Sequence, residues 1–438
     1  MATNDYKHGY GGDGLVNGNS SSQDYDEKAR SDFEVVPSKS KGSMGKDDPF
    51  GDETNSEVKY RTMAWWQAGM IMIAETISLG ILSLPSVLAS LGIVPAVILI
   101  IGLGIIATYT GYVIGQFKLA YPHVHNMADA GEVMAGRIGR EIFGGAQILF
   151  LVFVMGSHIL TFSIMMNTVT SHGTCTIVFG IVGMMVCIVF SLPRTLKKVS
   201  YMAIASFISI LSAVMITMIG VGVERPGSGK VDVTVQSDLS KGFEAVTNII
   251  FAYAGDLGHV AFFSFISELH TPESYPKAVF LLQGVDISMY LIVAIVTYRY
   301  AGSDVASPAL GSTSPLLRKI AYGIAIPTIV IAGVINGHVA SKYVYVRLFR
   351  GTDRMSKKSW SSFGLWAVIV LVLWTIAWII AEAIPVFNDL LSLISALFAS
   401  WFTMFLSRGH HLWTRTIFVR DGHQQGRHEL KRELFMRG

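Results

Sequence analysis

Apolar residues in this chain fall in about ten runs, separated by short polar segments. The runs cover residues 64–91, 93–116, 146–169, 174–192, 202–223, 243–269, 278–300, 322–346, 363–384 and 390–406. About 20 apolar residues suffice for a helix to cross a bilayer, so this pattern predicts an all-α polytopic membrane protein. We expect its transmembrane core, of about ten helices, to cover residues 59–406.

The first apolar run is interrupted near its middle. It carries the carboxylate of Glu75, two hydroxyl residues, a glycine and Pro85, a mixture that a simple membrane anchor does not need. At membrane depth, non-helical backbone is tolerated only where it is buried in protein or lines a water-filled cavity. We therefore expect two half-helices with an unwound joint near residues 79–81, and Pro85 in the first turn of the second half. A kinked but continuous helix with a Gly-Ser packing face is the alternative.

The sixth run is interrupted in a similar way, by Gly255, Asp256, Gly258 and His259. The distribution of positive charge makes the first run cross outward and the sixth run cross inward. Two broken helices of opposite direction, five spans apart, indicate an inverted five-plus-five helix repeat with a binding site at the midplane. This is the arrangement of a secondary transporter.

Other function classes lack their sequence features. A channel would show a repeated filter or rings of charge, and an enzyme would need a nucleophile with its base or a metal cluster. The intramembrane histidines His158, His259 and His338 lie in different runs without ligand spacing, so packed or hydrogen-bonded histidines are the simpler interpretation. Cys175 and Cys187 share one apolar region and also lack metal-ligand spacing. We expect no cofactor and no metal.

Composition and charge agree with this class and add an orientation. The chain has 438 residues, of which 51% are hydrophobic and 15% charged, and its net charge of +3 is too weak to indicate nucleic-acid binding. Lys and Arg gather after the second, fourth and eighth runs and towards both ends, which predicts that both termini are cytoplasmic. We expect residues 1–58 to form a disordered cytoplasmic tail and residues 407–438 a basic cytoplasmic tail. Either the plasma membrane or the vacuolar membrane fits this reading.

Several motifs resemble the amino acid/auxin permease family, and most closely its fungal neutral amino acid permeases. They are Glu-Thr-Ile-Ser-Leu-Gly-Ile-Leu-Ser-Leu-Pro from Glu75, Phe-Ala-Tyr-Ala-Gly from Phe251, and His-Val-Ala-Phe-Phe-Ser-Phe-Ile-Ser-Glu from His259. The loop stretches 129–139 and 193–198 add to the likeness, which covers residues 65–402. The resemblance implies a LeuT-like core that imports amino acids by alternating access, usually driven by the proton gradient.

The chain departs from the family's pattern at two places. Its sixth run reads Ala-Gly-Asp-Leu-Gly-His, where relatives usually run from Ala-Gly directly into His-Val-Ala. It becomes polar at Ser407, where relatives usually have an eleventh span. These departures keep a second function open, that of an amino acid sensor or receptor which binds its ligand on the same fold and transports little or none.

The broken helices suggest how an amino acid would bind. Its carboxylate would meet the exposed amides at residues 79–81, and its ammonium would meet unpaired carbonyls near Thr76 and residues 251–254. Phe251 and Tyr253 either wall the side-chain pocket or pack within the span. A pocket without a fixed counter-charge favours neutral substrates, because an unpaired charge there is costly. The expected substrate-binding residues are Thr76, Ser78, Leu79, Gly80, Ile81, Phe251, Ala252, Tyr253, Ala254 and Gly255.

Glu75 is the first candidate for coupling transport to an ion. Intramembrane carboxylates often take part in proton relays, although a hydrogen bond that only fixes helix packing is the alternative. His259 and Asn336 are further candidates, and the coupling ion is expected to be a proton, with sodium as a second possibility. The remaining membrane carboxylates, Glu268, Asp286 and Glu382, are expected to have packing or interface roles. The expected partners are an amino acid, the coupling ion and the lipid bilayer.

Overall fold

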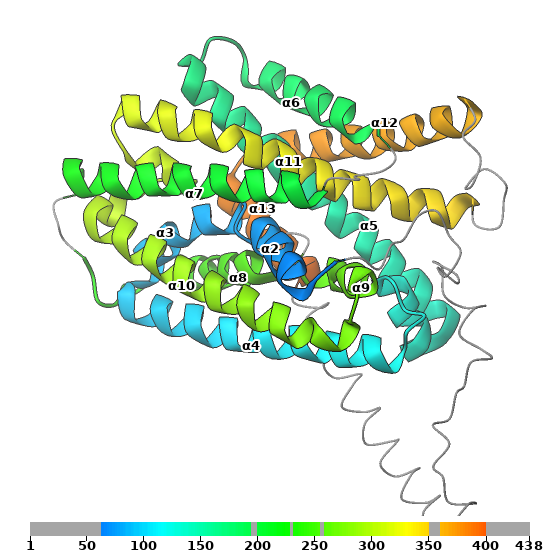
Figure 1. Cartoon of the computed structure of the whole chain (residues 1–438). Coiled ribbons are helices and arrows are strands. Elements are labelled where there is room, and N and C mark those ends of the chain that lie inside the picture. Colours follow the sequence, from blue (N-terminus) through cyan, green and yellow to red (C-terminus); the bar gives the residue numbers. More distant parts are fainter. Residues whose placement is uncertain (1–62, 194–198, 228–230, 255–257, 350–359, 400–438) are drawn as a thin grey trace, which may run out of the picture. The chain divides into compact units, whose positions relative to one another are not determined.

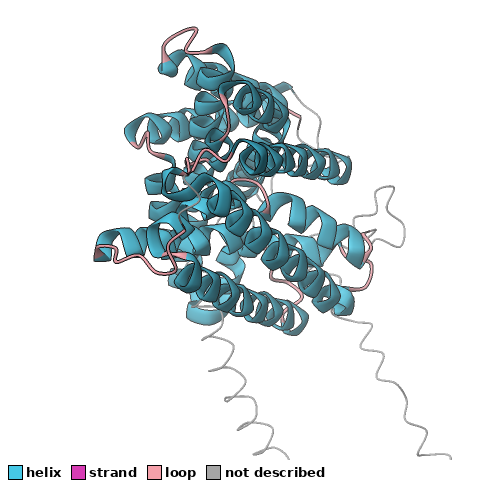
Figure 2. Ribbon diagram, turned by 90° about the vertical axis from the view of Figure 1, so that its left-hand side faces the viewer, coloured by secondary structure: helices cyan, strands magenta, loops and turns pink. Residues whose placement is uncertain are grey.

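The computed structural model describes residues 63–193, 199–227, 231–254, 258–349 and 360–399, and these residues form helices and the loops between them (Figure 1). The α-helices are α2 (Trp65–Thr76), α3 (Gly80–Leu91), α4 (Ile93–Ala120), α5 (Met127–Thr170), α6 (Thr176–Ser191), α7 (Val199–Glu224), α8 (Leu239–Ala254), α9 (Gly258–Glu268), α10 (Tyr275–Ala301), α11 (Pro315–Phe349), α12 (Trp360–Ala383) and α13 (Phe387–Ile394). Short 3₁₀ turns η2 (Pro272–Ser274), η3 (Gly302–Asp304) and η4 (Ala309–Ser312) connect them, and a π-helical turn, η5 (Ser395–Ala399), follows α13. The described part contains no strand, as Figure 2 shows, and the all-helical class expected from the apolar runs is confirmed.

Helices of membrane-spanning length make up most of the described chain. Six helices are long and apolar enough to cross a bilayer, and the bent pair α2 and α3 counts as a seventh span. Their outer faces carry bare apolar side chains, such as Ile98, which is 64% exposed, and Ile219, which is 60% exposed. Such side chains suit contact with lipid rather than water.

The start of α5 lies in the polar segment between the apolar runs 93–116 and 146–169, where hydropathy predicts no helix. Helix α4 continues to Ala120, and α5 begins at Met127 after an N-cap in which the Asn126 side chain accepts a hydrogen bond of 2.9 Å from the Asp129 amide. The backbone turns at Gly136, whose φ is +64°, and α5 then continues into the membrane run. Local capping and one glycine therefore produce a helical hairpin where hydropathy alone suggests a loop.

The two halves of the first run lie against helices from the second half of the chain. Helix α3 packs on α8, and α10 packs on α2, α3 and α4 (Figure 1). Helix α11 packs mainly on α5 and α7, and α12 packs mainly on α5. The joint between α2 and α3 is therefore enclosed by α8 and α10.

An extended segment holds the turn between α3 and α4. The Asp232 carbonyl accepts a hydrogen bond of 3.1 Å from the Ile93 amide, and the Val235 amide donates one of 3.0 Å to the Leu91 carbonyl. Gly92 lies between them with φ +88° and ψ 166°, a conformation that is almost exclusive to glycine. A Cβ added there would lie 2.6 Å from the Thr234 Cα, so the turn admits no side chain.

We expect Gly92→Ala to destabilise the folded chain by about 1–3 kcal/mol, because it combines a strained backbone with a main-chain clash. Thermal unfolding of the purified protein in detergent measures the effect. Gly102→Ala in α4 is the matched control, because an added Cβ there meets nothing within 4 Å. A similar fall in unfolding temperature for both variants would contradict this account.

Candidate functional site

The joint in the first run lies at residues 77–79. Helix α2 closes with the Ile77 amide donating to the Ile73 carbonyl at 3.0 Å, and α3 opens with the Leu82 amide donating to the Leu79 carbonyl at 3.1 Å. The two helices are bent by 53° at this point. The joint therefore begins two residues earlier than the expected 79–81, because Gly80 already starts α3.

Pro85 accordingly lies deeper in α3 than predicted. The expected position was the first turn of the second half-helix, but α3 begins at Gly80, so the proline falls in the second turn. It lacks an amide N–H, so the Ile81 carbonyl one turn earlier loses its usual donor. The proline thus removes one helical hydrogen bond beside the joint.

The joint presents polar groups in a buried place. The amides of Gly80 and Ile81 begin a helix, so they have no acceptor within it, and they carry the positive end of its dipole. The Ser78 side chain is fully buried, and its Oγ has no hydrogen-bond partner in the described part of the chain. These groups can donate hydrogen bonds to an anion such as a carboxylate and so orient it.

Helix α8 meets the joint at close range. A Cβ added to Gly80 would lie 2.5 Å from the Ala252 Cα and 3.3 Å from the Ala252 carbonyl oxygen. Only glycine permits this approach, because it brings the first turn of α3 against the last turn of α8. The structure therefore places two of the predicted binding residues in contact.

The interruption in the sixth run lies largely outside the described residues. Helix α8 ends at Ala254 and α9 begins at Gly258, with residues 255–257 between them not described. Gly255, a predicted binding residue, is one of these. His259 lies in the first turn of α9, and its side chain is outside the description.

Tyr290 on α10 joins the two helix ends, and it was absent from the sequence-based site. Its hydroxyl lies 3.0 Å from the Thr76 carbonyl oxygen and 2.7 Å from that of Ala252. A hydroxyl has a single proton, so the two carbonyls share it, and each keeps a lone pair for another donor. A tyrosine inside an apolar run usually indicates packing, so the sequence offered no signal for this contact.

The aromatic residues predicted near the site are buried. Phe251 and Tyr253 are almost fully enclosed, and so are Ala252 and Ala254. The Tyr253 hydroxyl donates to the Ile100 carbonyl in α4 at 2.9 Å, and its ring stacks edge-on against Tyr290 with centroids 5.2 Å apart. Tyr253 therefore ties α8 to α4 and α10.

The predicted coupling residues lie on separate helices. Glu75 is buried in the last turn of α2, next to Thr76, whose hydroxyl donates to the Met72 carbonyl at 3.0 Å. Asn336 is buried on α11, where its amide donates to the Ala332 carbonyl at 3.0 Å. Helices α2 and α11 both pack on α7. No group of three His, Cys, Asp or Glu side chains in the described residues is arranged to hold a metal ion.

Two further histidines are enclosed by aromatic and backbone neighbours. His158 lies against the backbone of Gly333, where an added Cβ would be 3.1 Å from the His158 Cβ. The His338 ring lies 5.2 Å from the Trp366 ring. Both contacts agree with the packing roles that the sequence suggested for intramembrane histidines.

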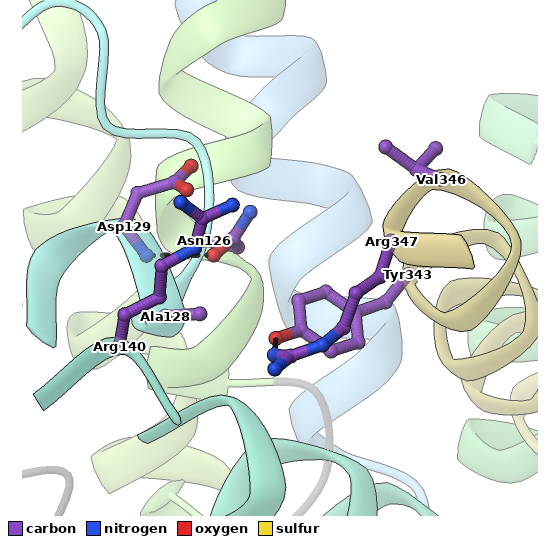
Figure 3. A pocket seen from close by; sticks show the side chains of 7 residues that line it. All are labelled: Asn126, Ala128, Asp129, Arg140, Tyr343, Val346 and Arg347. Atoms are coloured by element: carbon purple, nitrogen blue, oxygen red, sulfur yellow. Dashed lines mark hydrogen bonds between the residues drawn. The ribbon is translucent and has the colours of Figure 1, made fainter. Parts of the chain in front are cut away.

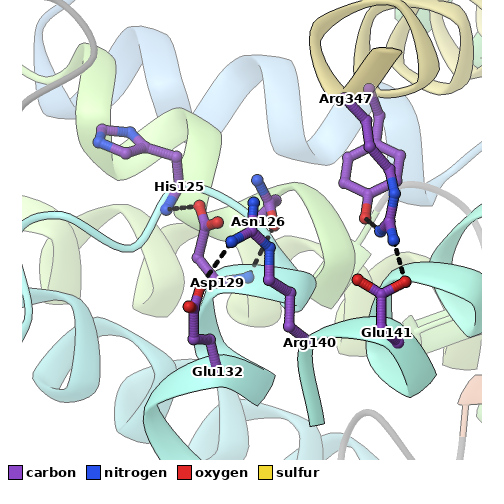
Figure 4. A network of polar contacts seen from close by, with 8 residues as sticks. His125, Asn126, Asp129, Glu132, Arg140, Glu141 and Arg347 are labelled. Atoms are coloured by element: carbon purple, nitrogen blue, oxygen red, sulfur yellow. Dashed lines mark hydrogen bonds and ion pairs between the residues drawn. The ribbon is translucent and has the colours of Figure 1, made fainter. Parts of the chain in front are cut away.

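A second polar feature lies where the start of α5 meets the end of α11. Arg140 pairs with Glu132 at 3.1 Å, and Arg347 contacts Glu141 and also donates to the Tyr343 hydroxyl at 3.0 Å (Figure 4). These side chains are substantially exposed, so each pair contributes only about 0–1 kcal/mol. The adjoining pocket is lined by Asn126, Ala128, Asp129, Arg140, Tyr343, Val346 and Arg347 (Figure 3).

This network suits a link between two helices better than a substrate site. Its arginines already have carboxylate partners, so they do not provide an unpaired charge for an anionic ligand. The Asp129 carboxylate accepts a hydrogen bond of 3.1 Å from the His125 amide and is likewise engaged. The joint between α2 and α3 is therefore the better candidate for amino acid binding.

The fold and the long apolar helices define the class: an integral membrane protein with a LeuT-like transporter fold. A solved structure of a Na⁺-coupled sialic acid symporter, in a substrate-bound outward-open state, superimposes with a TM-score of 0.52 at 12% sequence identity. The match covers 77% of this chain and 78% of the symporter chain. At this identity the likeness shows the fold alone.

The chain belongs to the transmembrane amino acid transporter protein family, whose family model matches residues 61–416. It is 41% identical over 357 residues to the N amino acid transport system protein of Neurospora crassa, covering 79% of this chain and 75% of the relative. A transmembrane transporter of Fusarium pseudograminearum is 31% identical, covering 86% of this chain and 80% of that protein. The resemblance found in the sequence is confirmed.

We expect Tyr290→Phe to lower the free energy of unfolding by about 1–3 kcal/mol, because two buried carbonyls lose their shared donor. Thermal unfolding of the purified variant measures this loss. Tyr298→Phe on the same helix is the control, since that hydroxyl accepts a weaker hydrogen bond of 3.3 Å from the part-buried Asp232 amide. Equal stability of the Tyr290 variant and the wild type would show that the hydroxyl does not hold the helix ends.

Proposed function

We propose that this chain is a secondary active transporter that carries neutral aliphatic and aromatic amino acids across a membrane by alternating access, coupled to the proton gradient. The observation that carries the proposal is the contact between the opened α2–α3 joint and the end of α8. Membership of an amino acid transporter family and the likeness to a symporter fold support it. We further propose that both termini are cytoplasmic, in the plasma membrane or the vacuolar membrane.

The helix ends match the two charges of an amino acid. The first amides of α3, at Gly80 and Ile81, would bind the carboxylate at the positive end of the helix dipole. The carbonyls at the ends of α2 and α8 would accept hydrogen bonds from the ammonium. Ser78, Leu79, Phe251 and the other predicted residues would complete the site around the substrate.

The preference for neutral substrates follows from the side chains near the joint. The helices α2, α3 and α8 contribute mainly apolar side chains there, and Phe251 is fully buried among them. An ionised substrate side chain without a partner in such a pocket costs several kcal/mol, roughly 2–7 for an uncompensated polar group and more for a charge. Acidic and basic amino acids would therefore bind weakly.

Uptake by the purified chain in liposomes tests the proposal. We expect an inward proton gradient to drive labelled L-leucine and L-phenylalanine above their equilibrium level, and dissipation of the gradient to abolish this accumulation. L-glutamate and L-lysine should compete poorly. Specific binding without accumulation would instead support the amino acid sensor, and the absence of any binding would remove the proposed site.

We also propose that Glu75 takes part in proton coupling, with His259 and Asn336 as further candidates. Glu75 is 2% exposed and directly precedes Thr76 at the joint. Ionising a buried carboxylate costs free energy, and this cost would fall when the joint opens to water on one side of the membrane.

We expect Glu75→Gln to take up amino acids at a rate that no longer depends on pH, because the glutamine cannot release a proton. Initial uptake rates between pH 5 and 8 measure this, with roughly equal rates as the criterion. Glu382→Gln on α12 serves as the control carboxylate and should keep the wild-type profile. An unchanged profile in the Glu75 variant would exclude the role.

A further inference from the structure

We infer that Asp286 on α10 binds the α-ammonium group of the substrate, an inference that rests on the proposed function and names a residue for it. Asp286 is fully buried, and neither carboxylate oxygen has a hydrogen-bond partner in the described part of the chain. The sequence suggested a packing or interface role for this residue in early span seven. The structure instead places it beside the joint, with Thr76 and Tyr253 as its polar neighbours. The Thr76 hydroxyl donates its proton to the Met72 carbonyl, so it leaves the carboxylate without a donor.

In the described part of the chain, Asp286 has no basic partner: Lys277 and Arg299 of α10 itself are exposed, nine and thirteen positions away. Helix α10 packs on α2, α3, α4 and α7. Helices α2, α3 and α7 contain no Lys, Arg or His. The single basic residue of α4 is Lys118, which donates to the Pro122 and Val124 carbonyls at 2.6 and 2.5 Å. The other carboxylate on these elements near the joint is Glu75, so the described neighbours of Asp286 leave a place for a cation that the substrate would bring.

The neighbouring backbone favours a cation at the same place. Tyr290 lies one turn after Asp286 on α10, so the two side chains share a face of the helix. Tyr290 reaches the carbonyls of Thr76 and Ala252, which are at or near the ends of α2 and α8, where the helix dipoles are negative. A carboxylate and two carbonyls provide three acceptors, the number of donors that an ammonium carries.

The spacing of the two charges also fits an α-amino acid. Gly80, which would hold the carboxylate, is close enough to Ala252 that an added Cβ would lie 3.3 Å from the Ala252 carbonyl oxygen. The anion-binding and cation-binding groups are therefore neighbours, as they must be for a ligand whose ammonium and carboxylate share one carbon atom. A carboxylic acid without the ammonium would leave Asp286 unpaired and would be rejected.

The test compares L-phenylalanine with L-3-phenyllactate, in which a hydroxyl replaces the ammonium. Both are used as competitors of labelled L-phenylalanine uptake by the full chain in liposomes. We expect the wild type to prefer phenylalanine by at least about 100-fold. Asp286→Asn should raise the KM for phenylalanine by about 10- to 100-fold and leave the inhibition constant of phenyllactate nearly unchanged or lower. Asp286→Glu should recover part of the preference.

Matched controls separate this role from a structural one. Asp304→Asn, the same change on the exposed turn η3, should keep the wild-type KM. Removing an unpaired buried carboxylate should leave the unfolding temperature of Asp286→Asn unchanged or raised. A wild type that does not discriminate the two competitors would overturn the inference without any variant, even if Asp286→Asn failed to fold.

Two other outcomes also overturn it. An unchanged KM in Asp286→Asn would exclude contact with the ammonium, and if uptake then also lost its pH dependence, the residue would be a proton site instead. Equal loss of affinity for phenylalanine and phenyllactate would indicate a general disturbance of the site. Failure of the wild type to take up any amino acid would count against the proposed function itself, which keeps the two hypotheses distinguishable.

Discussion

The structure depends on how a bilayer treats an unpaired main-chain group. Lipid offers no hydrogen bonds, so an opened helix is stable only where protein surrounds it. Residues 77–79 meet this condition because α8 and α10 enclose them, with the Tyr290 hydroxyl shared between the Thr76 and Ala252 carbonyls. Gly80 allows α3 to approach α8 closely. This contact both covers the joint and sets the distance between the two helices.

Polar chemistry in this chain is divided between two places with different character. The network of Arg140, Glu132, Arg347 and Glu141 is exposed and internally paired, so it links α5 to α11. The groups at the joint are buried, and several of them, including the Ser78 hydroxyl and the Asp286 carboxylate, have no partner in the described part of the chain. Burying a polar group without a partner destabilises the fold, and a bound ligand or proton can offset this penalty. Such groups therefore indicate function more strongly than the surface network does.

Much of the fold was predictable because its signals are local. Runs of apolar residues predicted the helices. The mixture of Glu75, Gly80 and Pro85 predicted an interruption of the first run, where the structure has a bend of 53° between α2 and α3. Other features were not predicted, because hydropathy is averaged over many residues and does not register a single cap or turn residue. The helical start of α5 depends on the Asn126 cap and Gly136, and the position of Pro85 in its helix depends on where α3 begins.

The sequence by itself determined that this is a helical membrane protein of an amino acid transporter family, and which segment of the first span is bent. Those properties follow from apolar length and from residues that are neighbours along the chain. Only the tertiary structure decided that Tyr290 holds the ends of α2 and α8 and that Asp286 is buried beside them. Both residues lie more than two hundred positions from Thr76, and contact between such distant residues arises from helix packing, which no local pattern encodes.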